Sequence, residues 1–289
     1  MKAVAHFALL TILVCLIQAP RMAWAGGHGP VFGLATPTNS KGEWSFDFAA
    51  FGRTGAGGSE VGTRSMITYG FTPHLQLSFA APGLLSVAPL PPSQSMNGED
   101  FTSTLGWRFH HNASKVGTRF ESTVFAGLTE PGVQRAGGVM GQLRRAPGIF
   151  SEIATGMASR SHYVWGGIGG TRYFQAGGDR RPDVLSYSLV YGYRPFPLRQ
   201  DYPHWDWRVF AEMTGENWGR TRHFDVLMPG TAGQQLLLGP TTLGIYKNFA
   251  IEGGVQFPIY RAGGSAFARE RTRYAINVSY FLFTNHGSH

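Results

Sequence analysis

The chain has 289 residues, a net charge of +8, 43% hydrophobic residues and only 15% charged residues. Its 40 glycines are about twice the share of an average soluble domain. Its 21 Phe, 11 Tyr and 7 Trp are too many for a disordered chain. A mean hydropathy of −0.12, without a long apolar run after the N-terminus, argues against a helical membrane protein. A β protein rich in glycine and aromatic residues fits these values.

Residues 1–25 have the pattern of a secretory signal peptide. Lys2 supplies the positive start, an apolar stretch follows, and an Ala-Trp-Ala cleavage site lies at 23–25. Its removal takes away Cys15, the only cysteine, so we expect an exported chain without disulfides. Loss of Lys2 and Arg21 lowers the net charge to +6, a surplus too diffuse for a nucleic-acid partner.

After the leader, apolar and polar residues alternate with a period of two, which is typical of strands. In 206–217, for example, Trp207 and Val209 fall on one face and Arg208 and Glu212 on the other. The twelve predicted strands are 44–50, 63–71, 75–79, 101–111, 117–129, 149–159, 163–175, 184–195, 206–217, 234–246, 248–259 and 271–283.

The connections between these strands alternate between short and long. Short ones lie near 74, 112, 161, 200 and 247, and longer ones at 54–62, 83–100, 130–148, 176–183, 218–233 and 260–270. Short periplasmic turns, longer outer loops and an even strand number are typical of an outer-membrane barrel. The sequence therefore predicts an all-β fold, a single transmembrane antiparallel up-and-down barrel of about twelve strands.

The expected organisation is a signal peptide at 1–25, a periplasmic leader at 26–42, the barrel at 43–283 and a periplasmic tail at 284–289. Aromatic residues such as Trp44, Tyr69 and Trp107 gather at the predicted periplasmic strand ends, as in an interfacial girdle. A secreted β-sandwich, the alternative, would instead place its aromatic residues in a central core. We therefore expect the outer membrane of a Gram-negative cell.

Charged side chains on the face opposite the apolar one are expected to line the lumen. They could brace a closed interior, or line a pore and select solutes. The predicted pore-lining residues are Arg64, Arg108, Arg119, Glu121, Glu152, Arg208, Glu212, Glu252, Arg271 and Arg273.

Eight of the nine mature histidines fall on the predicted periplasmic side, where they could form a metal-binding or pH-responsive rim. The weak metal candidates are His28, His286 and His289, and no pair has a strong ligand spacing. The simpler interpretation is that histidine is tolerated at a membrane interface. We predict no metal and no cofactor.

Known catalytic signatures are missing from the sequence. There is no GxSxG, GxxxxGK[ST] or HExxH motif, and the glycines of 166–170 do not have the spacing of a dinucleotide-binding loop. The chain is therefore predicted not to be an enzyme. An outer-membrane lipid hydrolase stays as the less favoured alternative.

Four short segments resemble a bacterial family of outer-membrane β-barrels. They are Tyr-Gly-Phe-Thr-Pro-His-Leu-Gln-Leu at 69–77, and the residues at 238–246, 249–252 and 256–261. The family is transporter-like and named after the meta-pathway of phenol degradation. The resemblance implies an uptake channel for small solutes, including hydrophobic or aromatic compounds, and carries no catalytic residue.

The predicted function is passive passage of small solutes through an outer-membrane channel. A closed structural barrel, or a metal-responsive one with a His-rich rim, is the alternative. The expected partners are outer-membrane lipid and lipopolysaccharide, a small-molecule solute and the barrel-assembly machinery. The sequence does not indicate an oligomeric state.

Overall fold

The structure is a computed structural model that describes residues 29–55, 58–87, 100–132, 143–200, 203–267 and 269–283. The predicted signal peptide, the tail at 284–289 and the candidate metal ligands His28, His286 and His289 lie outside the described residues.

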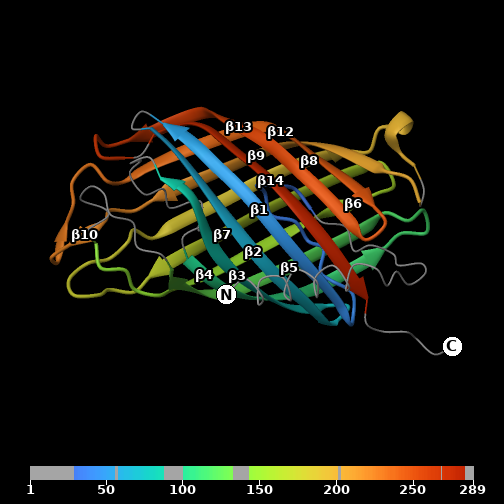
Figure 1. The fold of residues 1–289 in the computed structure, drawn as a ribbon, viewed down its shortest axis with the longest axis horizontal. Coiled ribbons are helices and arrows are strands. Elements are labelled where there is room, and N and C mark those ends of the chain that lie inside the picture. The colour runs from blue at the N-terminus through green and yellow to red at the C-terminus, as the bar shows by residue number, and fades with distance from the viewer. Residues whose placement is uncertain are drawn as a thin grey trace, which may run out of the picture.

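Twelve antiparallel strands form a closed barrel, which confirms the predicted fold class (Figure 1). Around the barrel the order is β1-β14-β13-β12-β9-β8-β7-β6-β5-β4-β3-β2, so each strand pairs with its sequence neighbours and β1 pairs with β14. The strands are β1 (Glu43–Gly55), β2 (Gly58–Thr72), β3 (Leu75–Val87), β4 (Asp100–Ala113), β5 (Arg119–Pro131), β6 (Gly148–Ala158), β7 (His162–Tyr173), β8 (Val184–Tyr193), β9 (Asp206–Trp218), β12 (Gly233–Tyr246), β13 (Phe249–Gly263) and β14 (Glu270–Phe283).

Three further elements lie outside the barrel wall. A two-stranded hairpin, β10 (Arg222–His223) with β11 (Val226–Leu227), lies in the loop between β9 and β12. A 3-10 helix, η1 (Phe196–Leu198), lies between β8 and β9. In the part of the chain that the structure describes, no helix has the length and apolar character needed to cross a membrane.

We call the two ends of the barrel the turn end and the loop end. The turn end holds the start of β1 and the connections β2–β3, β4–β5, β6–β7, β8–β9 and β12–β13, and the loop end holds β1–β2, β3–β4, β5–β6, β7–β8, β9–β12 and β13–β14. All twelve predicted strands are present, but several are longer than predicted. The predicted strand 75–79 extends to Val87, and β1 and β2 extend into the predicted loop 54–62. Hydrogen-bonded pairing continues here beyond the stretch of regular apolar alternation, which was the signal used to set the bounds.

Side chains alternate between the outside and the inside of the wall. In β1, Phe46 and Phe48 are 41% and 53% exposed on the outside, whereas Ser45 and Asp47 are buried inside. The register pairs Phe48 with Val278, which is also exposed, and Asp47 with Ser279, which is also buried. Large apolar groups facing outward and polar groups facing inward are the pattern of a barrel that lies in lipid.

The loops at the loop end are joined by the buried carboxylate of Asp179. It accepts hydrogen bonds from the backbone N–H groups of Arg144 (2.9 Å) and Phe224 (3.0 Å), and it lies 2.8 Å from Nδ1 of His223. Burial alone would raise the pKa of Asp179, but these donors hold it below its usual value. Three segments of the loop end therefore depend on one ionised side chain.

This contact predicts a local pH dependence. Because the folded pKa of Asp179 is lowered, its contribution is complete above the unfolded pKa of about 4 and is lost as pH falls through the folded value. Hydrogen exchange at the Phe224 amide should lose protection in acid, while amides in the barrel strands stay protected. Asp179→Asn should remove that pH dependence, and unchanged Phe224 protection down to the lowest pH would contradict the assignment.

The alternation of outward and inward residues in β14 predicts that two arginine substitutions destabilise the barrel to different extents. Val278 faces lipid near mid-strand, so Val278→Arg should lower the free energy of unfolding by about 2–4 kcal/mol. Ala275 lines an internal cavity, so Ala275→Arg should lower the free energy of unfolding by less. Urea refolding into detergent, read by the mobility shift of unboiled protein on gels, measures both variants. Equal losses would mean that the register is shifted by one residue.

Candidate functional site

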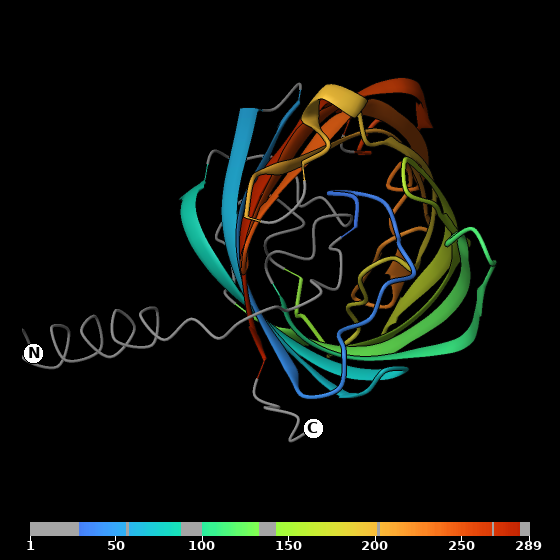
Figure 2. The same ribbon diagram turned by 90° about the vertical axis from the view of Figure 1, so that its right-hand side faces the viewer.

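The lumen contains part of the chain's own N-terminal leader. Residues 29–42, called here the inner segment, run inside the barrel rather than outside it (Figure 2). The segment enters beside the start of β1, and its far part bonds to side chains near the middle of β8 and β9. From the sequence this stretch is expected in a periplasmic leader, because the period-two pattern only begins at Trp44.

One carboxylate holds the far part of the inner segment. Glu212 of β9 accepts hydrogen bonds from the successive backbone N–H groups of Val31 (2.8 Å), Phe32 (2.7 Å) and Gly33 (2.8 Å). Glu212 is 0% exposed, and the Thr241 hydroxyl also donates to it. Bonds from N–H groups to a carboxylate are charge-assisted and stronger than neutral ones. Within the described residues no cation pairs with Glu212, so backbone dipoles and one hydroxyl stabilise its charge.

Further contacts follow the inner segment back to the turn end. The Leu34 N–H donates to the Ser188 hydroxyl (3.0 Å), and the Thr36 hydroxyl donates to Glu121 of β5 (3.1 Å). Thr123 returns a bond to the carbonyl of Thr36 (2.6 Å). The inner segment is therefore fixed to the inner faces of three strands, β5, β8 and β9.

The glycine-rich strand β7 makes room for the inner segment. A Cβ at Gly167 would lie 2.7 Å from Cδ1 of Leu34 and 2.8 Å from its Cβ. At the neighbouring Gly166, on the opposite face, the nearest atom is the Ser188 carbonyl oxygen at 3.8 Å. The absent side chain at Gly167 is thus a requirement for the segment to lie against the wall.

Two of the predicted lumen arginines belong to tight ion-pair networks. Arg273 contacts Glu216 at 2.9 Å and Glu270 at 3.0 Å, and Arg53 joins Glu270 at 3.5 Å. Because two guanidinium groups face two carboxylates, this network is electrically balanced near the loop end. The second network, at the turn end, pairs Arg108 with Glu121 at 2.9 Å.

Three more of the predicted arginines lie at or near strand ends. Arg208 contacts Asp206 at 3.3 Å, and Arg119 is exposed at the first position of β5. Arg271 is also exposed, because the register between β1 and β14 shifts after Thr54 and pairs Gly55 with Glu270. The shift gives Glu270, not Arg271, the buried position beside Arg273. A β-bulge of this kind is not visible as a break in the alternation of the sequence.

The remaining predicted residues face two internal cavities. The larger, of about 510 Å³, lies beside the inner segment and is lined by Arg64, Glu152 and Glu252 among others. The smaller, of about 380 Å³, is also lined by Arg64 and Glu152. Neither Arg64 nor Glu152 makes a hydrogen bond or ion pair with another described residue. These two volumes lie in the usual range for small-molecule pockets.

Metal binding has no support in this part of the molecule. Among residues 29–283, as far as the structure describes them, no group of three or more His, Cys, Asp and Glu side chains could hold a metal ion. Among the described histidines, His111 lies 3.6 Å from Glu121, and His162 forms a 2.9 Å hydrogen bond with Tyr191.

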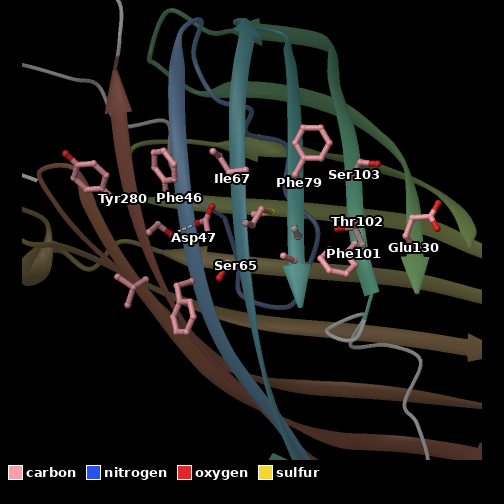
Figure 3. Close-up of a pocket in the computed structure, with 16 residues that line it drawn as sticks. Phe46, Asp47, Ser65, Ile67, Phe79, Phe101, Thr102, Ser103, Glu130 and Tyr280 are labelled. Atoms are coloured by element: carbon pink, nitrogen blue, oxygen red, sulfur yellow. Dashed lines mark hydrogen bonds between the residues drawn. The ribbon is translucent and has the colours of Figure 1, made fainter. Parts of the chain in front are cut away.

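The outer wall has an apolar groove of about 700 Å³ across β14, β1, β2, β3 and β4 (Figure 3). Small side chains such as Ser65 and Ser103 lie between larger ones, including Phe46, Phe79 and Phe101. The groove is on the face that alternation assigns to lipid, so acyl chains are the natural filling in a membrane. It carries one charged side chain that is exposed, Glu130 near the loop end of β5.

The chain has low sequence similarity to known proteins. No protein-family model matches the chain, and no curated protein matches it. Among solved structures, LpxR from Salmonella typhimurium is similar over 83% of this chain and 100% of its own, with 12% sequence identity and a TM-score of 0.37. The fold that the structure shows is a closed barrel of twelve antiparallel strands. Membership of the phenol-pathway transporter family remains a prediction.

The comparison corrects one expectation. The sequence analysis predicted that the chain is not an enzyme, but LpxR is a lipid A deacylase of the outer membrane. The motifs that the sequence lacks belong to soluble enzyme folds, so their absence does not exclude catalysis, and the prediction is not kept. The similarity is too low to assign a catalytic residue here.

The contact at Gly167 predicts a difference between two neighbouring substitutions. Gly167→Ala should displace Leu34 and weaken the docking of the inner segment by about 1–3 kcal/mol, whereas Gly166→Ala should have little effect. Hydrogen exchange at the amides of Val31–Leu34 measures the docking. Equal protection in the two variants would contradict the packing of Leu34 on β7.

Proposed function

We propose that the chain is an outer-membrane channel for small solutes and that the inner segment is its plug. The observation that carries this proposal is the incomplete filling of the lumen. The inner segment is attached by a few bonds and leaves cavities of about 510 and 380 Å³ beside it. A barrel built only as a closed scaffold gains stability by filling such space with side chains.

The lining of the cavities also favours a route for polar solutes. Arg64 and Glu152 face both cavities without a hydrogen bond or ion pair to another described residue, which leaves these side chains available to a solute. Charged side chains that line a lumen set which solutes pass through it. Lipid or lipopolysaccharide around the outer wall, export by the signal peptide and insertion by the assembly machinery belong to the same proposal.

In this proposal, opening depends on Glu212. Its bonds to three adjacent N–H groups are most of the hydrogen bonds that hold the far part of the inner segment, so their loss loosens that part while the contacts near Thr36 stay. Hydrogen bonds to a charged group contribute about 1.5–3 kcal/mol each. Loss of this attachment should therefore change the open fraction by an order of magnitude or more.

Glu212→Ala is expected to raise the rate of solute entry into proteoliposomes. The test is osmotic swelling with a series of neutral sugars, with Glu130→Ala as the control because Glu130 is exposed on the outer wall. Glu212→Ala should admit sugars at least about tenfold faster than the control. Swelling that matches empty liposomes in the wild type and in Glu212→Ala would contradict the channel and favour a closed barrel.

A further inference from the structure

We infer that the larger cavity is a binding site for a small organic cation, a primary ammonium group being the simplest. This inference rests on the proposed function, since it names the class of solute that the channel selects. It is carried by a cluster of acceptors on the inner faces of β13, β14 and β1.

The register of three adjacent strands builds the cluster. Glu252 of β13 lies directly opposite Asn277 of β14, and Ser279 of β14 lies opposite Asp47 of β1. The Asn277 amide donates to Glu252 Oε1 at 2.8 Å, and the Ser279 hydroxyl donates to Asp47 Oδ1 at 2.6 Å. Glu252, Asp47 and Asn277 all line the 510 Å³ cavity.

Two acceptor atoms of this cluster have no donor. Glu252 is only 8% exposed, yet its Oε2 has no hydrogen-bond partner among the described residues, and neither has Oδ1 of Asn277. A buried acceptor without a donor is costly, and a buried carboxylate without a compensating charge is more so. A ligand that donates several hydrogen bonds and carries a positive charge would satisfy both requirements. An ammonium group has three N–H donors and no acceptor.

The charges around the cavity favour the same sign. The Arg64 guanidinium interacts electrostatically with both Asp47 and Glu252, so one positive charge faces two carboxylates. Glu152 adds a third carboxylate without a described partner. Arg273 does not compensate for these, because Glu216 and Glu270 already contact it. Outside the Arg273 network the cavity lining therefore has three carboxyl groups and one guanidinium group, so a bound cation suits it better than a bound anion.

A metal ion fits this cavity less well than an organic cation. The described residues include no group of three or more carboxylate, His or Cys side chains arranged to hold a metal. The cavity is also far larger than an ion needs, and Phe51 and Ala49 give part of it an apolar lining. An alkyl chain attached to an ammonium group would contact that lining.

The experiment uses three probes that share one carbon chain: butylammonium, butyrate and butanol. Each is titrated into the mature protein in detergent by isothermal titration calorimetry. Butylammonium should bind, and butyrate and butanol should bind at least about tenfold more weakly. Butyrate binding as tightly as butylammonium, or no binding of butylammonium, would overturn the inference.

Variants then test the assignment to Glu252. Glu252→Gln and Asp47→Asn should each weaken butylammonium binding at least about tenfold, whereas Glu130→Gln should leave it unchanged. The mobility shift of unboiled protein identifies variants that are folded. Unaltered binding in folded Glu252→Gln and Asp47→Asn would overturn the site.

The channel itself is tested separately by sugar swelling with the wild type and Glu212→Ala. Sugar entry without butylammonium binding rejects the cation site alone. Butylammonium binding without sugar entry in either protein rejects the channel and leaves the cation site in place.

Discussion

The structure depends on the requirement that no backbone N–H or C=O group is left unpaired in hydrocarbon. A sheet meets this requirement only when its two edges join. Here β1 and β14 pair from Glu43 with Phe283 to Arg53 with Arg273, so the first and last strands complete the wall. Once the wall is closed, every strand has one face toward lipid and one toward the lumen. Near-neutral mean hydropathy, high glycine content and many aromatic residues all follow from those two faces.

Closure also forces polar groups into a confined interior, where an unpaired group is costly. Toward the two ends of the barrel these partners are side chains, as Arg273 has Glu216 and Glu270, and Arg108 has Glu121. Near mid-height the partner of Glu212 is the backbone of the inner segment. At mid-height the partner of Glu212 is therefore a segment that can move away, whereas the side-chain partners at the two ends belong to the barrel wall.

The sequence predicts much of the wall, because alternation is a local property. It identifies the strands, the inward side of Arg64, Glu212 and Glu252, and the closure by an even strand number. It does not predict the exposure of Arg271, since a bulge adds one residue without disturbing the residue types around it. Nor does it predict the inner segment, because that segment bonds through backbone N–H groups, which every residue other than proline has. Gly167 carries information about it only when Leu34 is known to lie beside it.

The inner segment has a consequence for the order of assembly. It connects directly to β1, and its far part is bonded to β8 and β9, which lie in the middle of the sequence. Pairing of β1 with β14 seals the wall along its whole length, and after that the N-terminal end can reach β9 only by threading through the turn end. Folding is simplest if the segment docks on β5, β8 and β9 while the sheet is still open. The contacts of Glu212 would then act as an internal template that brings β1 toward its final partner.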